Sequence, residues 1–223
     1  LHKALHSFPT RRSSDPAPAV PPRQAPPPRQ AERPPSVSLK ANLRIVAGQW
    51  RGRKLVAPEG DTTRPTADRT RETLFSMLAS RLGSFEGLAV ADLFAGSGAL
   101  GLEALSRGAA SCLFVEQDPA AIRAIRANIA ALRAQGQADV RAASVLSLGP
   151  AKAPLDLVFL DPPYQTGAGA VALDKLARLG WITPASWISL ETAADEEPKL
   201  RGFDVVAERR VGKARLTLLR LSA

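Results

Sequence analysis

The fold of this 223-residue chain is decided by the stretch Val90-Ala-Asp-Leu-Phe-Ala-Gly-Ser-Gly-Ala-Leu-Gly101. An apolar run typical of a buried strand leads into a glycine turn, and a helical pattern follows. Gly96, Gly98 and Gly101 satisfy the spacing G-x-G-x-x-G, and Glu116 ends the next predicted strand at about the distance expected for a ribose-binding acid. Glycines let a ligand approach the backbone, and a helix N-terminus favours an anionic group. We therefore predict a nucleotide-like ligand at this loop.

Two ligands compete for this loop, NAD and S-adenosylmethionine. Asp92 stands two residues before the loop, where its carboxylate would repel a pyrophosphate and attract an ammonium group. For S-adenosylmethionine, loop amides would face the methionine carboxylate, Asp92 would face the amine, and Glu116 would accept from both ribose hydroxyls. The residues favour the methyl donor and leave NAD open.

Apolar strand patterns alternate with helical patterns downstream of residue 87. Predicted strands cover residues 88–94, 111–116, 140–143, 155–160 and 187–190, and predicted helices cover residues 99–106, 119–134 and 171–179. Such alternation with apolar strands predicts a parallel sheet covered on both faces. Residues 203–208 and 215–221 are expected to close the sheet as an antiparallel pair. The fold class is therefore α/β.

The chain ahead of this fold divides into a tail and a basic extension. Residues 1–40 hold ten of the 19 prolines and predict a disordered, Pro-rich tail. Residues 1–15 contain HSFPTRRSSD, which we interpret as a translated sequencing adapter and exclude from fold reasoning. Residues 41–83 predict a hairpin, with strands at 44–47 and 54–57, and then a helix capped by Thr66 that runs to Leu82 and stops at Gly83. The α/β domain itself is expected at residues 84–223.

The composition excludes several kinds of chemistry. The net charge of +9 and the pI of about 10.5 indicate an anionic partner, and the excess of basic residues lies within the first 81 residues. The two histidines, His2 and His6, lie at the extreme N-terminus, so Ser-His-Asp hydrolysis and His-ligated metal sites are excluded for the folded part. The single cysteine fits a reducing, cytoplasmic location. We expect no metal and no membrane span.

The tetrapeptide Asp161-Pro-Pro-Tyr164, which ends the predicted strand at 155–160, carries the chemistry. In open parallel sheets ligands bind beyond the carboxyl ends of strands, so the tetrapeptide is expected beside the glycine loop. An exocyclic amine of a nucleobase is a poor nucleophile because its lone pair is delocalised into the ring. Hydrogen bonds to the Asp161 carboxylate and the Pro162 carbonyl would free that lone pair, Pro163 would help to fix the carbonyl direction, and Tyr164 would stack on the base.

Four motifs together resemble the bacterial RsmD-type 16S ribosomal RNA guanine-N2 methyltransferases. They are Arg44-Ile-Val-Ala-Gly-Gln-Trp-Arg-Gly-Arg-Lys-Leu55, Arg64-Pro-Thr-Ala-Asp-Arg-Thr-Arg-Glu-Thr-Leu-Phe75, Asp92-Leu-Phe-Ala-Gly-Ser-Gly-Ala-Leu-Gly-Leu-Glu-Ala-Leu105 and Asp161-Pro-Pro-Tyr164. The last two motifs occur across amino methyltransferases, whereas the first two in this order make the assignment narrow. The resemblance covers residues 44 to 221.

The resemblance implies a Rossmann-like methyltransferase fold with a mostly parallel seven-stranded sheet and antiparallel C-terminal strands. It implies S-adenosylmethionine as donor and, as acceptor, the N2 amine of guanine 966 in 16S rRNA on an assembling 30S particle. The family's catalytic motif falls on Asp161, Pro162, Pro163 and Tyr164, and its donor site falls on Asp92, Phe94, Gly96, Gly98 and Glu116. Two departures are Tyr164, where many relatives have Phe, and Ser144, where an Asn or Asp that meets the adenine is common. We expect Ser144 to make that adenine contact.

Basic residues surround one tryptophan in the extension. Phosphate contacts and a stacking aromatic would give RNA affinity that falls with salt. The predicted RNA-binding residues are Arg44, Trp50, Arg51, Arg53, Lys54, Arg64, Arg69 and Arg71. Asp68 and Glu72 are expected to order some of these arginines as pairs within the helix.

Three alternatives remain beside rRNA guanine-N2 methylation. DNA adenine-N6 methylation uses the same tetrapeptide, but this chain has no added target-recognition domain. An NAD-binding oxidoreductase would leave residues 161–164 without a role. A catalytically silent RNA-binding assembly factor could keep the donor fold. We expect a monomer.

Overall fold

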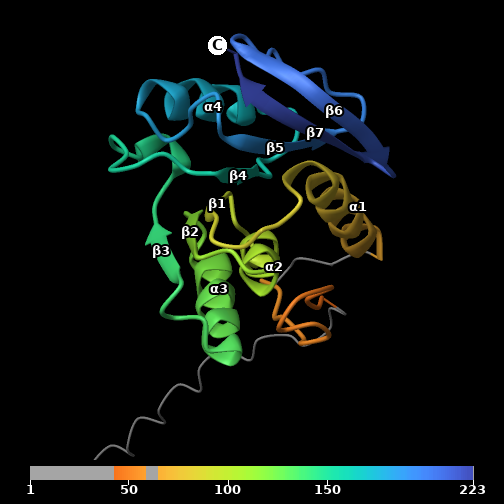
Figure 1. The fold of residues 1–223 in the computed structure, drawn as a ribbon, viewed down its shortest axis with the longest axis vertical. Helices are drawn as coiled ribbons and strands as arrows, with labels where there is room; N and C mark the ends of the chain where they lie inside the picture. The colour runs from red at the N-terminus through yellow and green to blue at the C-terminus, as the bar shows by residue number, and fades with distance from the viewer. Residues whose placement is uncertain (1–42, 59–64, 223) are drawn as a thin grey trace, which may run out of the picture. The chain divides into compact units, whose positions relative to one another are not determined.

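The computed structural model describes residues 43–58 and 65–222, and within them seven strands form one sheet (Figure 1). The strands are β1 (Ala89–Leu93), β2 (Ser111–Glu116), β3 (Ala138–Ala142), β4 (Leu157–Leu160), β5 (Trp187–Ala193), β6 (Phe203–Val211) and β7 (Ala214–Leu221). Their order is β3-β2-β1-β4-β5-β7-β6; β1 to β5 are parallel, and β7 is antiparallel to both β5 and β6. The predicted α/β fold with an antiparallel C-terminal pair is confirmed. The tail at 1–40 lies outside the described residues.

The helices of the described residues are α1 (Pro65–Leu82), α2 (Ala99–Ser106), α3 (Pro119–Leu132) and α4 (Ala168–Arg178), with a 3₁₀ turn η1 (Val145–Ser147). Local residues set their ends: Asp118 caps α3 by accepting from the amides of residues 120 and 121, and Gly83 ends α1 with a φ of 71°. None of these helices is long and apolar enough to cross a membrane.

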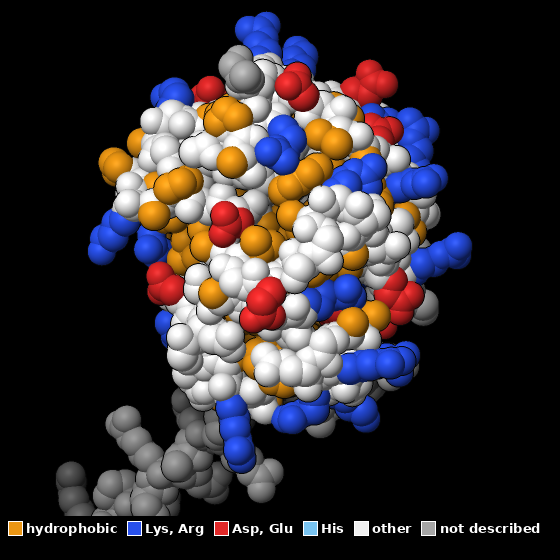
Figure 2. Space-filling model, viewed as in Figure 1, with side chains coloured by type: hydrophobic (Ala, Val, Ile, Leu, Met, Phe, Trp, Pro, Cys, Tyr) orange, Lys and Arg blue, Asp and Glu red, His pale blue; other side chains and the backbone are white. Residues whose placement is uncertain are grey.

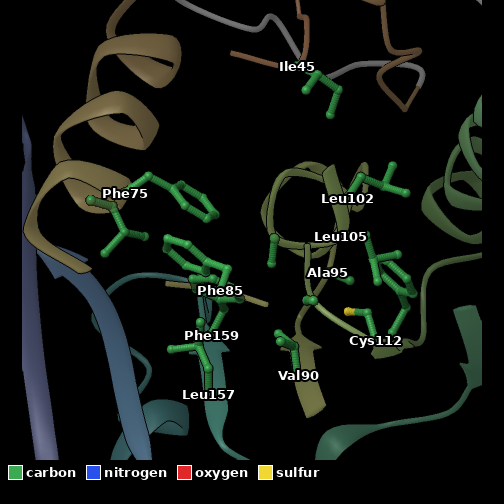
Figure 3. Packing of buried hydrophobic residues seen from close by; sticks show 14 of the residues in the cluster. Ile45, Phe75, Phe85, Val90, Ala95, Leu102, Leu105, Cys112, Leu157 and Phe159 are labelled. Atoms are coloured by element: carbon green, nitrogen blue, oxygen red, sulfur yellow. The ribbon is translucent and has the colours of Figure 1, made fainter. Parts of the chain in front are cut away.

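Helices cover both faces of the sheet because successive strand residues alternate between two cores. In β1, Val90 belongs to the core under α1, α2 and α3, whereas Ala91 and Leu93 belong to the core under α4 and η1. Figure 3 shows part of the first core, where Phe75 of α1 meets Phe159 of β4 with ring centroids 5.5 Å apart. This packing holds the carboxyl ends of β1, β2 and β4 in place beside one another.

Buried polar side chains anchor residues 43–58 to the helices. Glu103 of α2 is fully buried, and its carboxylate accepts from the amides of Val46 at 2.7 Å and Ala47 at 3.0 Å. The side-chain amide of Asn128 in α3 pairs with the backbone of Val56, accepting from its N–H at 2.7 Å and donating to its carbonyl at 2.9 Å. The extension and the sheet therefore share one core, while the predicted division at residues 83 and 84 stays a prediction.

The predicted strands at 44–47 and 54–57 are wrong. In the described part of the chain, this segment keeps one isolated antiparallel bridge, between Arg44 and Lys54, and turns occupy its tip. The two arms still share backbone hydrogen bonds, from Ile45 to the Arg53 carbonyl at 3.0 Å and from Leu55 to the Leu43 carbonyl at 2.8 Å. The amides of Gln49 and Trp50, in the turn between them, donate to the carbonyl and the hydroxyl of Ser106 in α2. The predicted hairpin is thus reduced to a short pairing of its two arms, because tertiary hydrogen bonds to α2 take the amides of Val46 and Ala47.

Several other boundaries differ from prediction by one to three residues, and two of them have a clear structural reason. Helix α1 begins at Pro65, so Thr66 lies inside its first turn rather than at the cap, in keeping with the preference of proline for the first helical position. Strand β5 continues to Ala193, three residues past the predicted end, because it pairs with β7 along that length.

Candidate active site

Two neighbouring cavities lie at the carboxyl ends of the parallel strands. The larger cavity has a volume of about 620 Å³, and eleven residues line it: Phe94, Gly96, Val115, Glu116, Gln117, Ala143, Val145, Asp161, Pro162, Pro163 and Tyr164. These come from the ends of β1, β2, β3 and β4, as the rule for ligands of open parallel sheets requires. Three of the six predicted donor residues, Phe94, Gly96 and Glu116, and all four residues of the tetrapeptide therefore meet at one site, whereas Asp92, Gly98 and Ser144 do not line this cavity.

The glycine loop bends sharply between β1 and α2. Phe94, Gly96 and Gly98 have φ values of 60°, 55° and 76°, and the left-handed Gly98 is the N-cap of α2. A Cβ at Gly101 would lie 2.4 Å from the ring of Phe114, so only glycine lets α2 pack this closely on β2. The three glycines thus serve the turn and the packing that hold the larger cavity open.

Glu116 is held in place by backbone amides. Its Oε2 accepts from the Gly96 amide at 2.9 Å, and its Oε1 accepts from the amides of Gln117 at 2.7 Å and Asp118 at 2.9 Å. The Gly96 amide, predicted to face a ligand carboxylate, therefore bonds Glu116 instead. These contacts orient an acidic group at the wall of the larger cavity, where a ribose diol would need it.

Asp92 is almost completely buried. Its Oδ2 accepts from the Gly101 amide at 2.8 Å. The pKa of Asp92 is raised from 3.8 to about 7, mainly by burial; the Gly101 hydrogen bond partly opposes this shift, and the nearby Glu116 charge adds to it. Asp92 lines the smaller cavity described below, so its predicted contact with a donor amine stays a prediction.

The tetrapeptide follows β4 directly. The Asp161 amide bonds the Leu93 carbonyl at 3.4 Å, which ties the motif to the end of β1. Pro162 is buried, whereas Asp161 and Pro163 are exposed and Tyr164 keeps 42% of its surface exposed. The motif thus presents a carboxylate, a fixed backbone and an aromatic ring at the cavity, as predicted for an amine-activating site.

A smaller cavity of about 180 Å³ adjoins the larger one. Its lining residues are Leu43, Thr70, Arg71, Leu74, Asp92, Phe94, Ala95, Gly96, Ser97, Ala99, Leu100, Asp161 and Glu191. Three residues, Phe94, Gly96 and Asp161, line both cavities. The extension and α1 form one wall of this cavity, and the glycine loop forms another. Asp161 therefore stands between two compartments.

The Ser144 hydroxyl, which was predicted to contact the adenine, makes a different hydrogen bond in the structure. Ala143 and Val145 line the larger cavity, while Ser144 Oγ accepts from the Leu146 amide at 3.3 Å and caps η1. The contact stays a prediction.

The predicted RNA-binding residues divide by exposure. Exposed residues are Arg44, Arg51, Arg53, Lys54 and Arg69, and Trp50 is half-buried against the core. Figure 2 shows Lys and Arg side chains along the lower right of the drawn face, near the extension and α1 in Figure 1. Arg64 lies outside the described residues.

Arg71, one of the predicted RNA-binding residues, is buried instead of facing solvent. It is only 5% exposed, it forms the expected pair with Asp68 at 2.9 Å, and it donates to the Arg44 carbonyl at 2.7 Å. Its side chain is buried because α1 packs against the extension at this point. Arg71 therefore reaches a ligand only through the smaller cavity.

Glu191 is the residue of the site that sequence reasoning missed. It lies near the carboxyl end of β5, and its Oε1 accepts from the Tyr164 hydroxyl at 2.7 Å. One sequence signal pointed to Glu191: it is an acidic residue near the end of a parallel strand that lies next to the strand of the tetrapeptide. Among the described residues, no group of histidine, cysteine or acidic side chains could hold a metal ion.

The strand order, the glycine loop, the oriented Glu116 and the Asp161–Tyr164 motif define a Rossmann-like S-adenosylmethionine-dependent methyltransferase. The larger cavity fits the methyl donor because it offers a fixed carboxylate for the ribose and apolar walls at Val115 and Val145 for the adenine. The fold and the family therefore imply S-adenosylmethionine as the cofactor, and they favour it over NAD.

The chain belongs to the family described as Conserved hypothetical protein 95, whose family model matches residues 43–220. It is 40% identical over 161 residues to ribosomal RNA small subunit methyltransferase D of Escherichia coli K12, covering 72% of this chain and 80% of that protein. The protein of the same name from Haemophilus influenzae is also 40% identical over 161 residues, covering 70% and 82%. The resemblance to RsmD-type enzymes is confirmed.

Solved structures give the same fold. The Escherichia coli protein yhhF superposes with a TM-score of 0.70 at 36% identity and covers 81% of this chain and 98% of its own. Magnesium protoporphyrin IX methyltransferase from Synechocystis, solved with bound S-adenosylmethionine, has a TM-score of 0.57 at 16% identity over 73% of this chain and 87% of its own. The second likeness concerns the fold alone.

Proposed function

We propose that this protein transfers a methyl group from S-adenosylmethionine to the N2 amine of a guanine in 16S rRNA, at family position 966, within an assembling 30S subunit. One observation carries the proposal: Asp161 and Tyr164 line the same cavity as Glu116, so the groups that would bind an acceptor amine adjoin a group that would bind the donor. The names of the relatives, ribosomal RNA small subunit methyltransferase D, support rRNA as the substrate class.

Beyond the edge formed by residues 161–164, the larger cavity is the donor side. Bound S-adenosylmethionine supplies a methyl group activated by its sulfonium. Glu116, fixed by three backbone amides, accepts from the ribose hydroxyls, and Val145 covers the adenine. Gly96 and Gly98 keep the loop clear of side chains, and Phe94 lines both this side and the smaller cavity.

The edge of the larger cavity formed by residues 161–164 is the acceptor side, while the smaller cavity, which Asp92 and the glycine loop line, takes the methionine end of the donor. The Asp161 carboxylate and the Pro162 carbonyl accept hydrogen bonds from the guanine N2 amine, which directs its lone pair toward the donor. Pro162 and Pro163 fix the backbone so that the carbonyl keeps its direction. As the nitrogen–carbon bond forms and the carbon–sulfur bond of the donor breaks, N2 loses the proton held in its hydrogen bond to the Asp161 carboxylate, which is exposed and passes the proton to solvent. Tyr164 offers its exposed ring to the base.

The basic extension is the RNA-binding surface. Exposed residues of this segment and α1, among them Arg51, Lys54 and Arg69, contact phosphates, while the half-buried Trp50 supplies an apolar edge. The wall that the extension gives to the smaller cavity supports this role, since that cavity adjoins Asp161 and RNA held beside it lies next to the acceptor side. The enzyme acts as a monomer in the cytoplasm.

The experiment that tests the proposal is methylation of 30S particles lacking the modification, followed by nucleoside mass spectrometry and mapping of the 16S rRNA. The expected product is N2-methylguanosine at one position. Asp161→Ala should abolish the product while calorimetry still detects donor binding, and Asp139→Ala, a matched change of an exposed acid on β3, should leave both intact. A different methylated nucleoside, or full turnover by Asp161→Ala, would overturn the proposal.

A further inference from the structure

The smaller cavity contains one cationic side chain, that of Arg71 in α1. Among the described residues that line the two cavities, Arg71 is the one with a positive charge. The other charged residues that line the smaller cavity are acids, namely Asp92, Asp161 and Glu191. The methionine end of S-adenosylmethionine carries an ammonium group and a carboxylate. The acids suit the ammonium group, so Arg71 is the charged partner left for the carboxylate.

The glycine loop has fewer free amides for that carboxylate than its sequence predicts. The Gly96 amide donates to Glu116 at 2.9 Å. The Gly101 amide donates to Asp92 at 2.8 Å, and the Gly98 amide donates to a carbonyl within the loop at 2.7 Å. Because a buried charge without hydrogen-bond partners is costly, a carboxylate in this cavity needs a donor from outside the loop.

Arg71 has hydrogen-bond donors to spare. Its Nη2 donates to the Arg44 carbonyl at 2.7 Å and to Asp68 at 2.9 Å, which fixes the guanidinium against the extension. In the part of the chain that the structure describes, neither the buried Nε nor Nη1 has a hydrogen-bond partner. A buried donor without a partner is unfavourable, so the guanidinium favours an acceptor on a ligand in the smaller cavity.

We infer that Arg71 binds the carboxylate at the methionine end of S-adenosylmethionine. The inference deepens the proposed function, because it rests on the placement of the methionine end in the smaller cavity. A guanidinium bonds a carboxylate through charge-assisted hydrogen bonds, which are stronger than those from neutral amides. The positive charge that was predicted to contact RNA phosphates binds the anionic group of the donor instead. Helix α1 is thereby part of the donor site, although it precedes the glycine loop in the sequence.

The test compares S-adenosylmethionine with its decarboxylated form, which keeps the adenosine, the sulfonium and the amine and lacks only the carboxylate. Calorimetry measures both dissociation constants in the absence of RNA. The wild-type protein should bind S-adenosylmethionine about 10- to 100-fold more tightly than the decarboxylated form. Arg71→Gln removes the positive charge and should bring the two affinities to within about threefold, mainly by weakening S-adenosylmethionine.

Two further variants and a third ligand control the comparison. Arg71→Lys keeps the charge and should keep a preference larger than that of Arg71→Gln. Arg81→Gln, a matched change of an exposed arginine in the last turn of α1, should keep the wild-type ratio. Methylthioadenosine lacks the whole amino-acid end, so it should bind all of these proteins with the same affinity and report an intact adenosine site.

The outcomes separate the two claims. Equal affinity of the wild-type protein for both donors overturns the inference, and so does an Arg71→Gln variant that weakens both donors by the same factor, since Arg71 then has only a structural role. Should Arg71→Gln fail to fold, wild-type protein with nitrogen-15-labelled arginine carries the test. The Nε–H resonance that is missing in Arg71→Lys must shift more with S-adenosylmethionine than with the decarboxylated form, and identical shifts overturn the inference. The proposed function fails in a different assay, when 30S particles gain no N2-methylguanosine, and that result leaves the donor ratio unaffected.

Discussion

Asp92 makes the stability of this fold depend on pH in the opposite sense to an ordinary carboxylate. Its pKa is 3.8 in an unperturbed setting and about 7 in the folded chain, because burial penalises the charged form. Below about pH 4 the group is protonated in both states. Between about pH 4 and 7 the folded state keeps a proton that the unfolded state has lost, so the free energy of unfolding decreases as pH rises. Above about pH 7 the group is ionised in both states and its contribution is constant.

The structure sets the size of this effect. Each pKa unit is worth about 1.4 kcal/mol, so the difference between 3.8 and about 7 corresponds to about 4 kcal/mol of stability lost across that range. Asp92→Asn removes the titration and keeps an oxygen that can accept from the Gly101 amide. The free energy of unfolding of the variant relative to wild type should therefore rise by about 4 kcal/mol between pH 4 and pH 8. A constant cost of the amide shifts this difference equally at every pH and leaves the rise unchanged.

The assay is chemical denaturation of both proteins at several pH values, read as the difference in free energy of unfolding. The difference cancels the titration of all other groups. Asp139→Asn serves as the control, because the Asp139 side chain is 62% exposed and its difference from wild type should stay flat. A flat difference for Asp92→Asn, within about 0.5 kcal/mol, would refute the assignment of a neutral buried acid.

The same ionisation tests the predicted contact between Asp92 and the donor amine. An ammonium group close to the carboxylate lowers its pKa, so donor binding at pH 7 should release a fraction of a proton. Calorimetry in buffers of different ionisation enthalpy measures this release. Proton release should disappear in Asp92→Asn; release that persists there would place the titrating group elsewhere.

Three further perturbations follow from the packing. Gly48→Ala should loosen the extension and speed its proteolysis, because Gly48 has a φ of 82° and a Cβ there would lie 1.8 Å from the carbonyl oxygen of Ser106, the last residue of α2. Gly52 has a φ of 80° but open space where a Cβ would lie, so Gly52→Ala should act more weakly. Gly101→Ala should lower the free energy of unfolding by about 1–3 kcal/mol through overpacking on Phe114, as denaturation would measure. Arg51→Ala should weaken RNA binding and reduce its salt slope by about 1, and an unchanged slope would remove Arg51 from the phosphate contacts.

Periodicity predicted the central elements well because their signals are local. Helix α2 and strand β2 have the predicted bounds, since a glycine turn precedes one and a continuous apolar run forms the other. The tetrapeptide and Glu116 were predicted beside the glycine loop because the carboxyl ends of parallel strands meet at one edge of the sheet. These rules need no knowledge of distant contacts.

The errors arise where a distant polar side chain decides the backbone. The amides of Val46 and Ala47 looked available for a hairpin, but Glu103, 56 residues or more away in sequence, accepts both. Glu103 stands in an apolar helix, where an acidic residue is easily taken for a solvent-facing one. Glu191 was missed for a similar reason, since its place in the site depends on the contact with the Tyr164 hydroxyl.

The basic extension helps to form a cavity of the candidate site and is not a separate appendage to a neutral fold. Leu43 and Arg71 line the smaller cavity together with the glycine loop, so this cavity would be open without them. Asn128 ties this wall to the loop itself, because its side-chain amide donates to the carbonyls of both Val56 and Ser97 at 2.9 Å. The segment that carries the positive charge is thereby fixed to the segment that surrounds the donor. Under the proposed function, RNA bound by the extension would be held at a set distance from Asp161, as the transfer of a methyl group between two large ligands requires.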